Sequence, residues 1–136
     1  MRIYLAGRYS RRRELQQYGK RLEAAGHRIV SSWVDGHHES RPNVDATATD
    51  EERGMWADED LTDIEIADLL ILFTEKESIG YSRGGRFGEM GYALGRRKDV
   101  IVVGPRENVF CCLWEVTQFT TFAECLAAQA PVEATR

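Results

Sequence analysis

The sequence predicts a single α/β domain, a three-layer α/β/α sandwich around a doubly wound, mainly parallel five-stranded sheet. Short apolar runs alternate with helical patterns along the 136 residues, an order that is typical of parallel sheets. The run Leu69–Phe73 is apolar at every position, as expected of a central strand that helices cover on both faces. We expect one domain over residues 1–136, with a loose tail at residues 130–136.

Composition indicates an ordinary globular chain and argues against several classes of partner. Hydrophobic residues make up 43% and charged residues 29%, and the net charge is −4 with a pI near 5.4. This acidic balance does not suit binding to nucleic-acid polymers. No apolar run approaches the length of a membrane span, and the N-terminus runs directly into a strand. We therefore expect no membrane partner, no signal peptide and a cytoplasmic location.

The first half of the chain predicts a strand, a helix, a strand, a long loop and a second helix. The expected elements are a strand at Arg2–Ala6, a turn at Gly7–Ser10, a helix from an N-cap at Ser10 to about Ala25, a strand at Arg28–Trp33, a polar loop at Asp35–Asp50 and a helix at Glu51–Ala67. The residues of the second helix that we expect to face inward are Met55, Leu61, Ile64 and Ala67.

The second half predicts three more strands and two more helices. After the strand at Leu69–Phe73, the expected elements are a loop at Thr74–Arg83, a helix at Gly84–Arg96, a strand at Val100–Val103, a turn at Gly104–Glu107, a short strand at Val116–Phe119 and a helix at Thr121–Gln129. We expect the first strand to lie between the second and third, in a flavodoxin-like order. The turn Gly7–Ser10 and the segment Ser82–Glu89 then meet at the carboxyl edge of the sheet, where such folds bind ligands.

The stretch Ser82–Leu94 is a glycine-rich turn that leads into a helix, with Glu89 early in that helix. A helix N-terminus gathers unpaired N–H groups and partial positive charge, so we expect Glu89 to be ionised near neutral pH. A positioned carboxylate of this kind can act as a nucleophile. The same pattern also occurs in ordinary helix capping, so this stretch alone leaves both interpretations open.

Other polar residues are candidates for the same edge. A glycine turn with arginines at a helix start suits a phosphate, and Arg8 and Ser10 lie in that turn. Asp60 shares a helical face with apolar residues, so it is either a paired core residue or part of a site. The adjacent histidines His37 and His38 point in different directions and have no further ligands at useful spacing. We therefore expect no metal, and no cofactor is indicated.

Three segments, which together span nearly the whole domain, resemble the nucleoside 2-deoxyribosyltransferase family, including its nucleoside 5′-phosphate N-glycosidases. Ile3–Gly7 resembles the family's first strand, in which a tyrosine is shortly followed by a glycine. Asp60–Asp68 resembles its helix-to-strand segment with an active-site aspartate, and Gly85–Ala93 resembles its nucleophile segment. The order of the three segments along the chain makes the resemblance specific.

The resemblance implies an N-glycosyl transferase or hydrolase that acts through a covalent intermediate. Glu89 would attack the anomeric carbon of a (deoxy)ribosyl group, and a second base, or water, would then attack with overall retention. Tyr4 would orient the Glu89 carboxylate, and Asp60 would contact the base and could assist its departure by proton transfer. The resemblance also implies a homodimer or larger homo-oligomer with shared active sites, in which Asn108 would come from a neighbouring subunit.

One departure from the family pattern concerns the substrate, a nucleoside or nucleotide. Family members that act on free nucleosides carry an acidic residue shortly before the nucleophile, whereas this chain has Ser82–Gly84 there. Phosphate-recognising relatives have a serine at this place, which suits a 5′-monophosphate. The substrate-binding candidates are Gly7, Arg8, Ser10, Ser82, Arg83, Gly85, Arg86 and Asn108. Transfer to another base is our first interpretation, hydrolysis of a nucleoside 5′-monophosphate the second, and a non-catalytic nucleotide-binding module the third.

Overall fold

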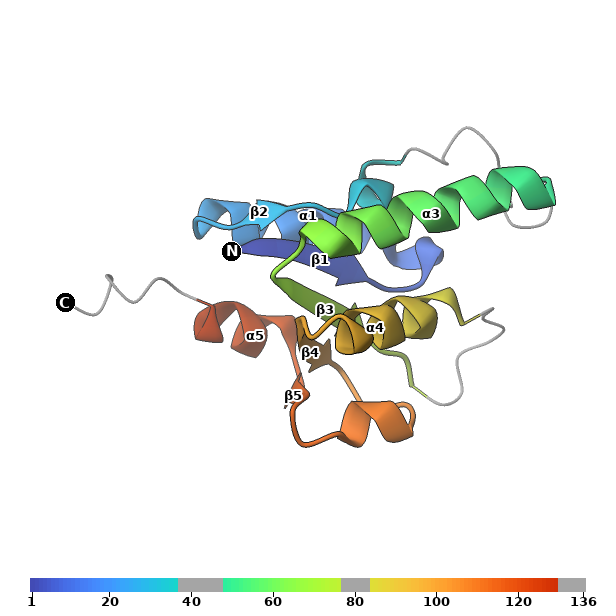
Figure 1. Cartoon of the computed structure of the whole chain (residues 1–136). Coiled ribbons are helices and arrows are strands. Elements are labelled where there is room, and N and C mark those ends of the chain that lie inside the picture. Colours follow the sequence, from blue (N-terminus) through green and yellow to red (C-terminus); the bar gives the residue numbers. More distant parts are fainter. Residues whose placement is uncertain (37–47, 77–83, 130–136) are drawn as a thin grey trace.

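The structure is a computed structural model of the chain, and it describes residues 1–36, 48–76 and 84–129. Its strands form a parallel sheet in the order β2-β1-β3-β4-β5, which confirms the expected flavodoxin-like order (Figure 1). The strands are β1 (Arg2–Ala6), β2 (Arg28–Ile29), β3 (Leu69–Phe73), β4 (Asp99–Val103) and β5 (Thr117–Phe119). The helices are α1 (Arg12–Ala24), α3 (Asp50–Ile66), α4 (Gly85–Gly95) and α5 (Phe122–Ala128), and short 3-10 helices lie at Tyr9–Arg11, Ser32–Asp35 and Val109–Cys112.

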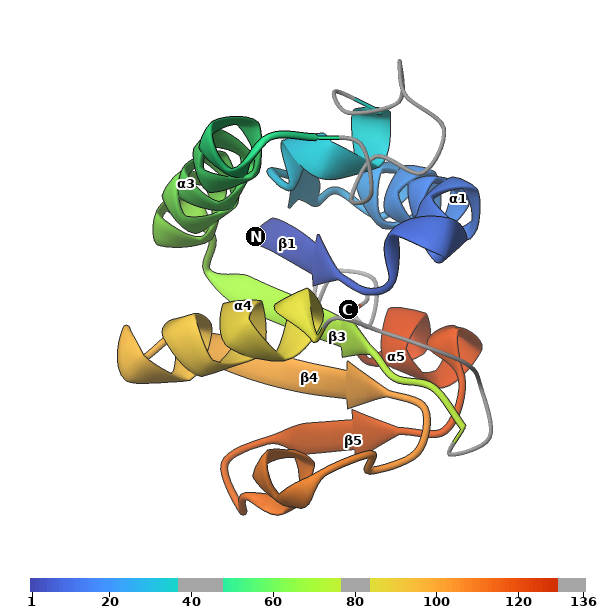
Figure 2. The same cartoon turned by 90° about the vertical axis from the view of Figure 1, so that its right-hand side faces the viewer.

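Helices cover both faces of the sheet, so the architecture is the expected three-layer sandwich. α3 and α4 pack against each other on one face, and α1 and α5 pack on the other (Figure 2). Side chains of β1 alternate between these faces. Leu5 approaches Gly19 of α1, whereas Tyr4 reaches Glu89 of α4 on the opposite face. The alternation therefore carries the Tyr4 hydroxyl into the layer formed by α3 and α4.

The second strand is shorter than the sequence predicted. We expected Arg28–Trp33, but β2 ends at Ile29 and the chain turns into the 3-10 helix at Ser32–Asp35. Side chains then take over the pairing of Leu5 in β1. The Ser31 hydroxyl accepts from Leu5 N at 3.0 Å, and Trp33 Nε1 donates to Leu5 O at 2.7 Å. The backbone of β1 thus stays satisfied where its neighbouring strand has ended.

Two local predictions about the helices were wrong. Ser10 lies in the 3-10 helix Tyr9–Arg11, so it does not cap α1; Arg11 holds that position, without a side-chain capping bond. Met55 is 65% exposed, whereas Ile64 is fully buried. The N-terminal half of α3 extends beyond the sheet (Figure 1), so an apolar residue there has no core to pack against. Thr49 and Glu52 form a reciprocal capping box that secures this end of α3.

The carboxyl ends of β1, β3 and β4 form one edge of the sheet, and the start of α4 lies at this edge (Figure 2). Gly84 precedes α4 with φ of 81°, a conformation that favours glycine, and so directs the chain into the helix. Tyr4 lies opposite Leu70 in the register of β1 and β3. The strand β1 therefore positions Tyr4, and the helices α3 and α4 supply the other two catalytic candidates, Asp60 and Glu89.

Candidate active site

Glu89 of α4 and Tyr4 of β1 form the centre of the candidate site. The Tyr4 hydroxyl donates a hydrogen bond to Glu89 Oε2, although the two residues are 85 positions apart in the chain. Tyr4 is fully buried in the central sheet, and this rigid position holds its hydroxyl toward α4. Burial, followed by the charges of Glu89 and Asp60, raises the pKa of Tyr4 well above its usual value. Tyr4 therefore remains a proton donor to the carboxyl group throughout the neutral range.

Asp60 of α3 lies beside this pair and interacts with both of its members. Burial, together with the negative charges of Asp63 and Glu59, raises the pKa of Asp60 to about 7. Its Oδ1 atom is buried and has no hydrogen-bond partner within the described part of the chain. An unsatisfied buried acceptor favours a ligand or water that donates to it, so this geometry supports a site over a paired core residue.

Glu89 differs from the sequence-based expectation in its protonation. We expected an ionised carboxylate, but burial of the carboxyl group and then the charge of Asp60 raise the pKa of Glu89 to about 8. The hydrogen bond from Tyr4 acts in the opposite direction and lowers it. Glu89 is the fifth residue of α4, so it lies beyond the first turn where the helix dipole is strongest. Near neutral pH the Asp60–Glu89 pair therefore retains a proton between its two carboxyl groups.

The acidic neighbours of Asp60 were missed in the sequence. Asp63 Oδ2 accepts from Ser32 N at 3.0 Å and from Ser32 Oγ at 2.6 Å. Ser32 Oγ also donates to Glu59 Oε1 at 2.9 Å. These bonds tie α3 to the 3-10 helix after β2 and hold two carboxylates near Asp60. The spacing of Asp60 and Asp63, three positions apart on a helix, was the available signal.

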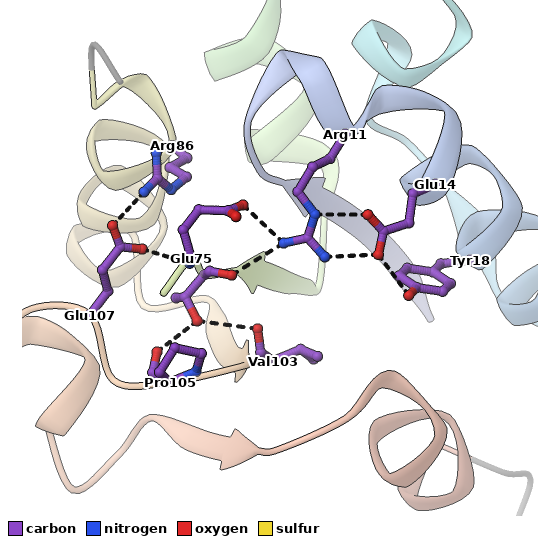
Figure 3. Close-up of polar contacts among 9 residues, drawn as sticks. Arg11, Glu14, Tyr18, Glu75, Arg86, Val103, Pro105 and Glu107 are labelled. Carbon is purple, nitrogen blue, oxygen red and sulfur yellow. Dashed lines mark hydrogen bonds and ion pairs between the residues drawn. The ribbon is translucent and has the colours of Figure 1, made fainter. Parts of the chain in front are cut away.

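A second polar cluster, the Arg–Glu network, lies at the carboxyl edge beside the start of α4 (Figure 3). Arg86 of α4, a phosphate candidate, is 4% exposed and its Nη2 donates to Glu107 Oε2 at 2.6 Å. Glu107 Oε1 accepts from Glu75 N at 2.9 Å, and Glu75 Oε2 accepts from Arg11 Nη1 at 3.0 Å. Arg11 also donates to Glu14 of α1. Arg86 is thus already engaged by a carboxylate of the protein itself.

The remaining candidates occupy varied places. Gly7 packs tightly, because a Cβ there would lie 2.9 Å from Leu15 Cδ2. Arg8 and Ser10 lie in the turn after β1, and Gly85 opens α4. Asn108 caps the 3-10 helix that follows β4, where its Oδ1 accepts from Phe110 N at 3.0 Å. The predicted roles of His37, His38, Ser82 and Arg83 concern positions outside the described residues.

Comparison with solved structures identifies the fold. A 2-deoxyribosyltransferase from Bacillus psychrosaccharolyticus matches with a TM-score of 0.69 and 17% identity, over 96% of this chain and 96% of that one. The CMP N-glycosidase BcmB from Clostridium botulinum matches with a TM-score of 0.58 and 17% identity, over 94% of this chain and 97% of that one. No protein-family model and no curated protein sequence matches the chain. In the part of the chain that the structure describes, no helix has the length and apolar character needed to span a bilayer. The chain therefore has the fold of the nucleoside 2-deoxyribosyltransferase family, to which its three sequence motifs pointed.

Proposed function

We propose that this protein is an enzyme that cleaves the N-glycosidic bond of a (deoxy)nucleoside or its 5′-monophosphate and transfers the sugar to another base. The observation that carries the proposal is the cluster of Tyr4, Asp60 and Glu89. In this cluster two partly buried carboxyl groups with raised pKa values lie next to each other. Strongly shifted groups that lie together on different elements are typical of acid–base and nucleophilic chemistry.

In the first half-reaction, the proton of the carboxyl pair resides on Asp60, and Glu89 is ionised. Glu89 attacks the anomeric carbon as the N-glycosidic bond breaks, which forms a glycosyl ester. Asp60 transfers its proton to the departing base, so the leaving group departs neutral. The hydrogen bond from Tyr4 stabilises the ionised form of Glu89, but burial and the charge of Asp60 hold its pKa at about 8, above the value of about 7 for Asp60. The proton therefore moves from Glu89 to Asp60 before the attack.

In the second half-reaction, an incoming base attacks the anomeric carbon and releases Glu89 as a carboxylate. Asp60 accepts the proton that the incoming base loses, which restores the starting state. Two inversions produce overall retention, as in retaining glycosidases. The raised pKa of Asp60, about 7, suits a group that must donate and then accept a proton near neutral pH.

Hydrolysis of a nucleoside 5′-monophosphate is the second candidate, with water in place of the acceptor base. It is favoured by the similarity to a CMP N-glycosidase and by Ser82–Gly84, which has no acidic residue before the nucleophile. The pairing of Arg86 with Glu107 weakens it, because that guanidinium is not available to a phosphate unless the ion pair opens. Arg8, Ser10, Ser82 and Arg83 are then the proposed phosphate ligands.

The deciding experiment is a chromatographic assay for released base, with a panel of nucleosides and their 5′-monophosphates, each with and without an acceptor base. Exchange that requires the acceptor supports the transferase. Release from monophosphates without an acceptor supports the hydrolase instead. Absence of release from every substrate, combined with measurable nucleotide binding, would contradict both and leave a non-catalytic binding module.

A further inference from the structure

A pair of hydrogen bonds, here called the Ser32–Asp63 clamp, joins α3 to the segment that follows β2. Asp63 Oδ2 accepts from both the N–H and the hydroxyl of Ser32, at 3.0 Å and 2.6 Å. The residues on both sides of Ser32 are bonded in turn to Leu5 of β1, the neighbour of Tyr4 in the chain. The clamp therefore fixes Asp63 relative to the strand that presents the Tyr4 hydroxyl.

The clamp favours Asp63 over Glu59, the second carboxylate within reach of Ser32. Ser32 Oγ lies 2.6 Å from Asp63 Oδ2 and 2.9 Å from Glu59 Oε1, yet a serine hydroxyl has only one proton to donate. The backbone N–H of Ser32 donates to Asp63 in addition. Hydrogen bonds to an ionised acceptor are stronger than neutral ones. The clamp therefore holds the carboxylate of Asp63 more firmly than that of Glu59.

Asp63 follows Asp60 by one helical turn, a spacing at which side chains are neighbours with Cβ atoms about 5–6 Å apart. Both residues are only partly exposed, so water screens their repulsion incompletely. Burial raises the pKa of Asp60, and the charge of Asp63 comes next, ahead of that of Glu59. The titratable groups that act on Asp60 from the elements packed around it are all acidic: Tyr4 of β1, Glu89 of α4, and Glu59 and Asp63 of α3.

We propose that Asp63 is a positioning residue of the candidate site, a fixed negative charge that directs the shared proton of the carboxyl pair to Asp60. The inference rests on the proposed function, in which Glu89 is ionised and Asp60 carries the proton when the N-glycosidic bond breaks. A proton on Asp60 removes its repulsion with Asp63, so this arrangement is stabilised relative to the one with the proton on Glu89. Asp63 acts through Asp60 and not on the substrate.

The first test follows the carboxyl carbons by carbon-13 NMR as the pH is raised, and it needs no substrate. Asp63→Asn removes the charge but keeps the size of the side chain, and its amide oxygen can still accept from Ser32. The titration midpoint of Asp60 should move to lower pH in this variant. The shift should be smaller in Glu59→Gln, because the charge of Glu59 acts less strongly on Asp60.

The matched control for the titration is Asp58→Asn, because Asp58 is an exposed aspartate of the same helix. This variant should leave the midpoint of Asp60 unchanged. A midpoint that stays in place or rises in Asp63→Asn would overturn the proposal.

The second test compares kcat/KM of the wild type and Asp63→Asn across pH, with the best substrate of the base-release panel. Above pH about 8 the pair has lost its proton, so the active fraction depends on how tightly Asp60 binds one. Asp63→Asn should therefore lose at least about fivefold there. Near pH 5 both carboxyl groups are protonated, and the active fraction depends only on the ionisation of Glu89. The variant should then match the wild type.

An equal loss at every pH would indicate a purely structural role for Asp63 and would contradict the proposal. The two levels of inference also fail in different ways. Absence of base release by the wild type would refute the proposed function, whereas an unshifted titration of Asp60 in Asp63→Asn would refute this inference alone.

Discussion

Two groups of partly buried charged residues lie near the start of α4, and their charges are arranged in opposite ways. In the Arg–Glu network, each carboxylate pairs with an arginine: the buried Glu75 pairs with Arg11, and the partly exposed Glu107 pairs with Arg86. In the acidic cluster, Asp60 and Glu89 lie beside each other. The charges of Asp63 and Glu59, which act on Asp60, are also negative.

The protonation behaviour of the two groups follows from this difference. The hydrogen bond from Arg11 lowers the pKa of Glu14, at the edge of the network. Burial and like charge raise the pKa values of Asp60 and Glu89 to about 7 and about 8. Compensated charges hold loops and helices in place, whereas uncompensated carboxyl groups destabilise the fold unless they have another use. The comparison therefore distinguishes charged groups that stabilise the fold from charged groups that we propose to be catalytic.

The largest expected effect is on catalysis, from Glu89→Gln. The amide keeps the size of the side chain and can accept from Tyr4, but it cannot form the glycosyl ester. Turnover should fall by at least about 1,000-fold, while substrate affinity changes only a few-fold. Base release and calorimetric binding measure the two quantities. Glu23→Gln, an exposed glutamate on α1, is the control and should remain active. Normal turnover by Glu89→Gln would refute the assignment of the nucleophile.

The next effect comes from Asp60→Asn, which should lower kcat/KM by about 100-fold at neutral pH, because the leaving base loses its proton donor. The wild type needs one proton on the pair. Its kcat/KM should rise as pH approaches about 7 and fall above about 8. In Asp60→Asn the fall at high pH should disappear, and the remaining rise should shift to lower pH because the charge that raised the pKa of Glu89 is gone. An unchanged bell-shaped profile would argue against Asp60 as the acid.

In the Arg–Glu network, removal of a charge should destabilise the protein. Arg86→Met leaves Glu107 without its ion pair, and the Glu107 side chain is only 23% exposed. The free energy of unfolding should fall by about 3 kcal/mol, as measured by urea denaturation. The double variant Arg86→Met/Glu107→Met should recover part of this loss, since no unpaired charge remains. Full stability of the single variant would show that this pair contributes little.

In the acidic cluster, removal of a charge should have the opposite sign. The pKa of Glu89 in the folded protein, about 8, exceeds its usual value, so the folded state holds the proton more tightly than the unfolded chain. Stability is therefore lost as pH rises from about 4 toward 8. Glu89→Gln removes this loss and should stabilise the protein by about 2 kcal/mol at pH 8, with a smaller gain at pH 5. Thermal unfolding at the two pH values measures the difference, and a variant less stable than wild type at pH 8 would break the comparison.

Local pattern was enough to predict most of the secondary structure and the order of the sheet. The run Leu69–Phe73 became β3 with those bounds, as expected of five apolar residues in succession that form a strand covered on both faces. The predicted helix Gly84–Arg96 matches α4 to within one residue at each end. Boundaries failed where a distant residue decided them. β2 ended early, and beyond its end the side chains of Ser31 and Trp33 bond to Leu5 in place of a strand backbone, a pairing that no local pattern reveals.

The sequence by itself determined the fold class and the strand order, because hydrophobic periodicity is a local property, and its resemblance to the family made Tyr4, Asp60 and Glu89 the catalytic candidates. Only the tertiary structure decided the electrostatic state of those residues. Helix position alone predicted an ionised Glu89, whereas packing buried its carboxyl group, placed Asp60 beside it and so raised the pKa of Glu89. Packing likewise engaged Arg86 with Glu107 and buried Arg11 against Glu75. The physical reason is that charge interactions depend on distance and burial, which residues far apart in sequence acquire only when the chain folds.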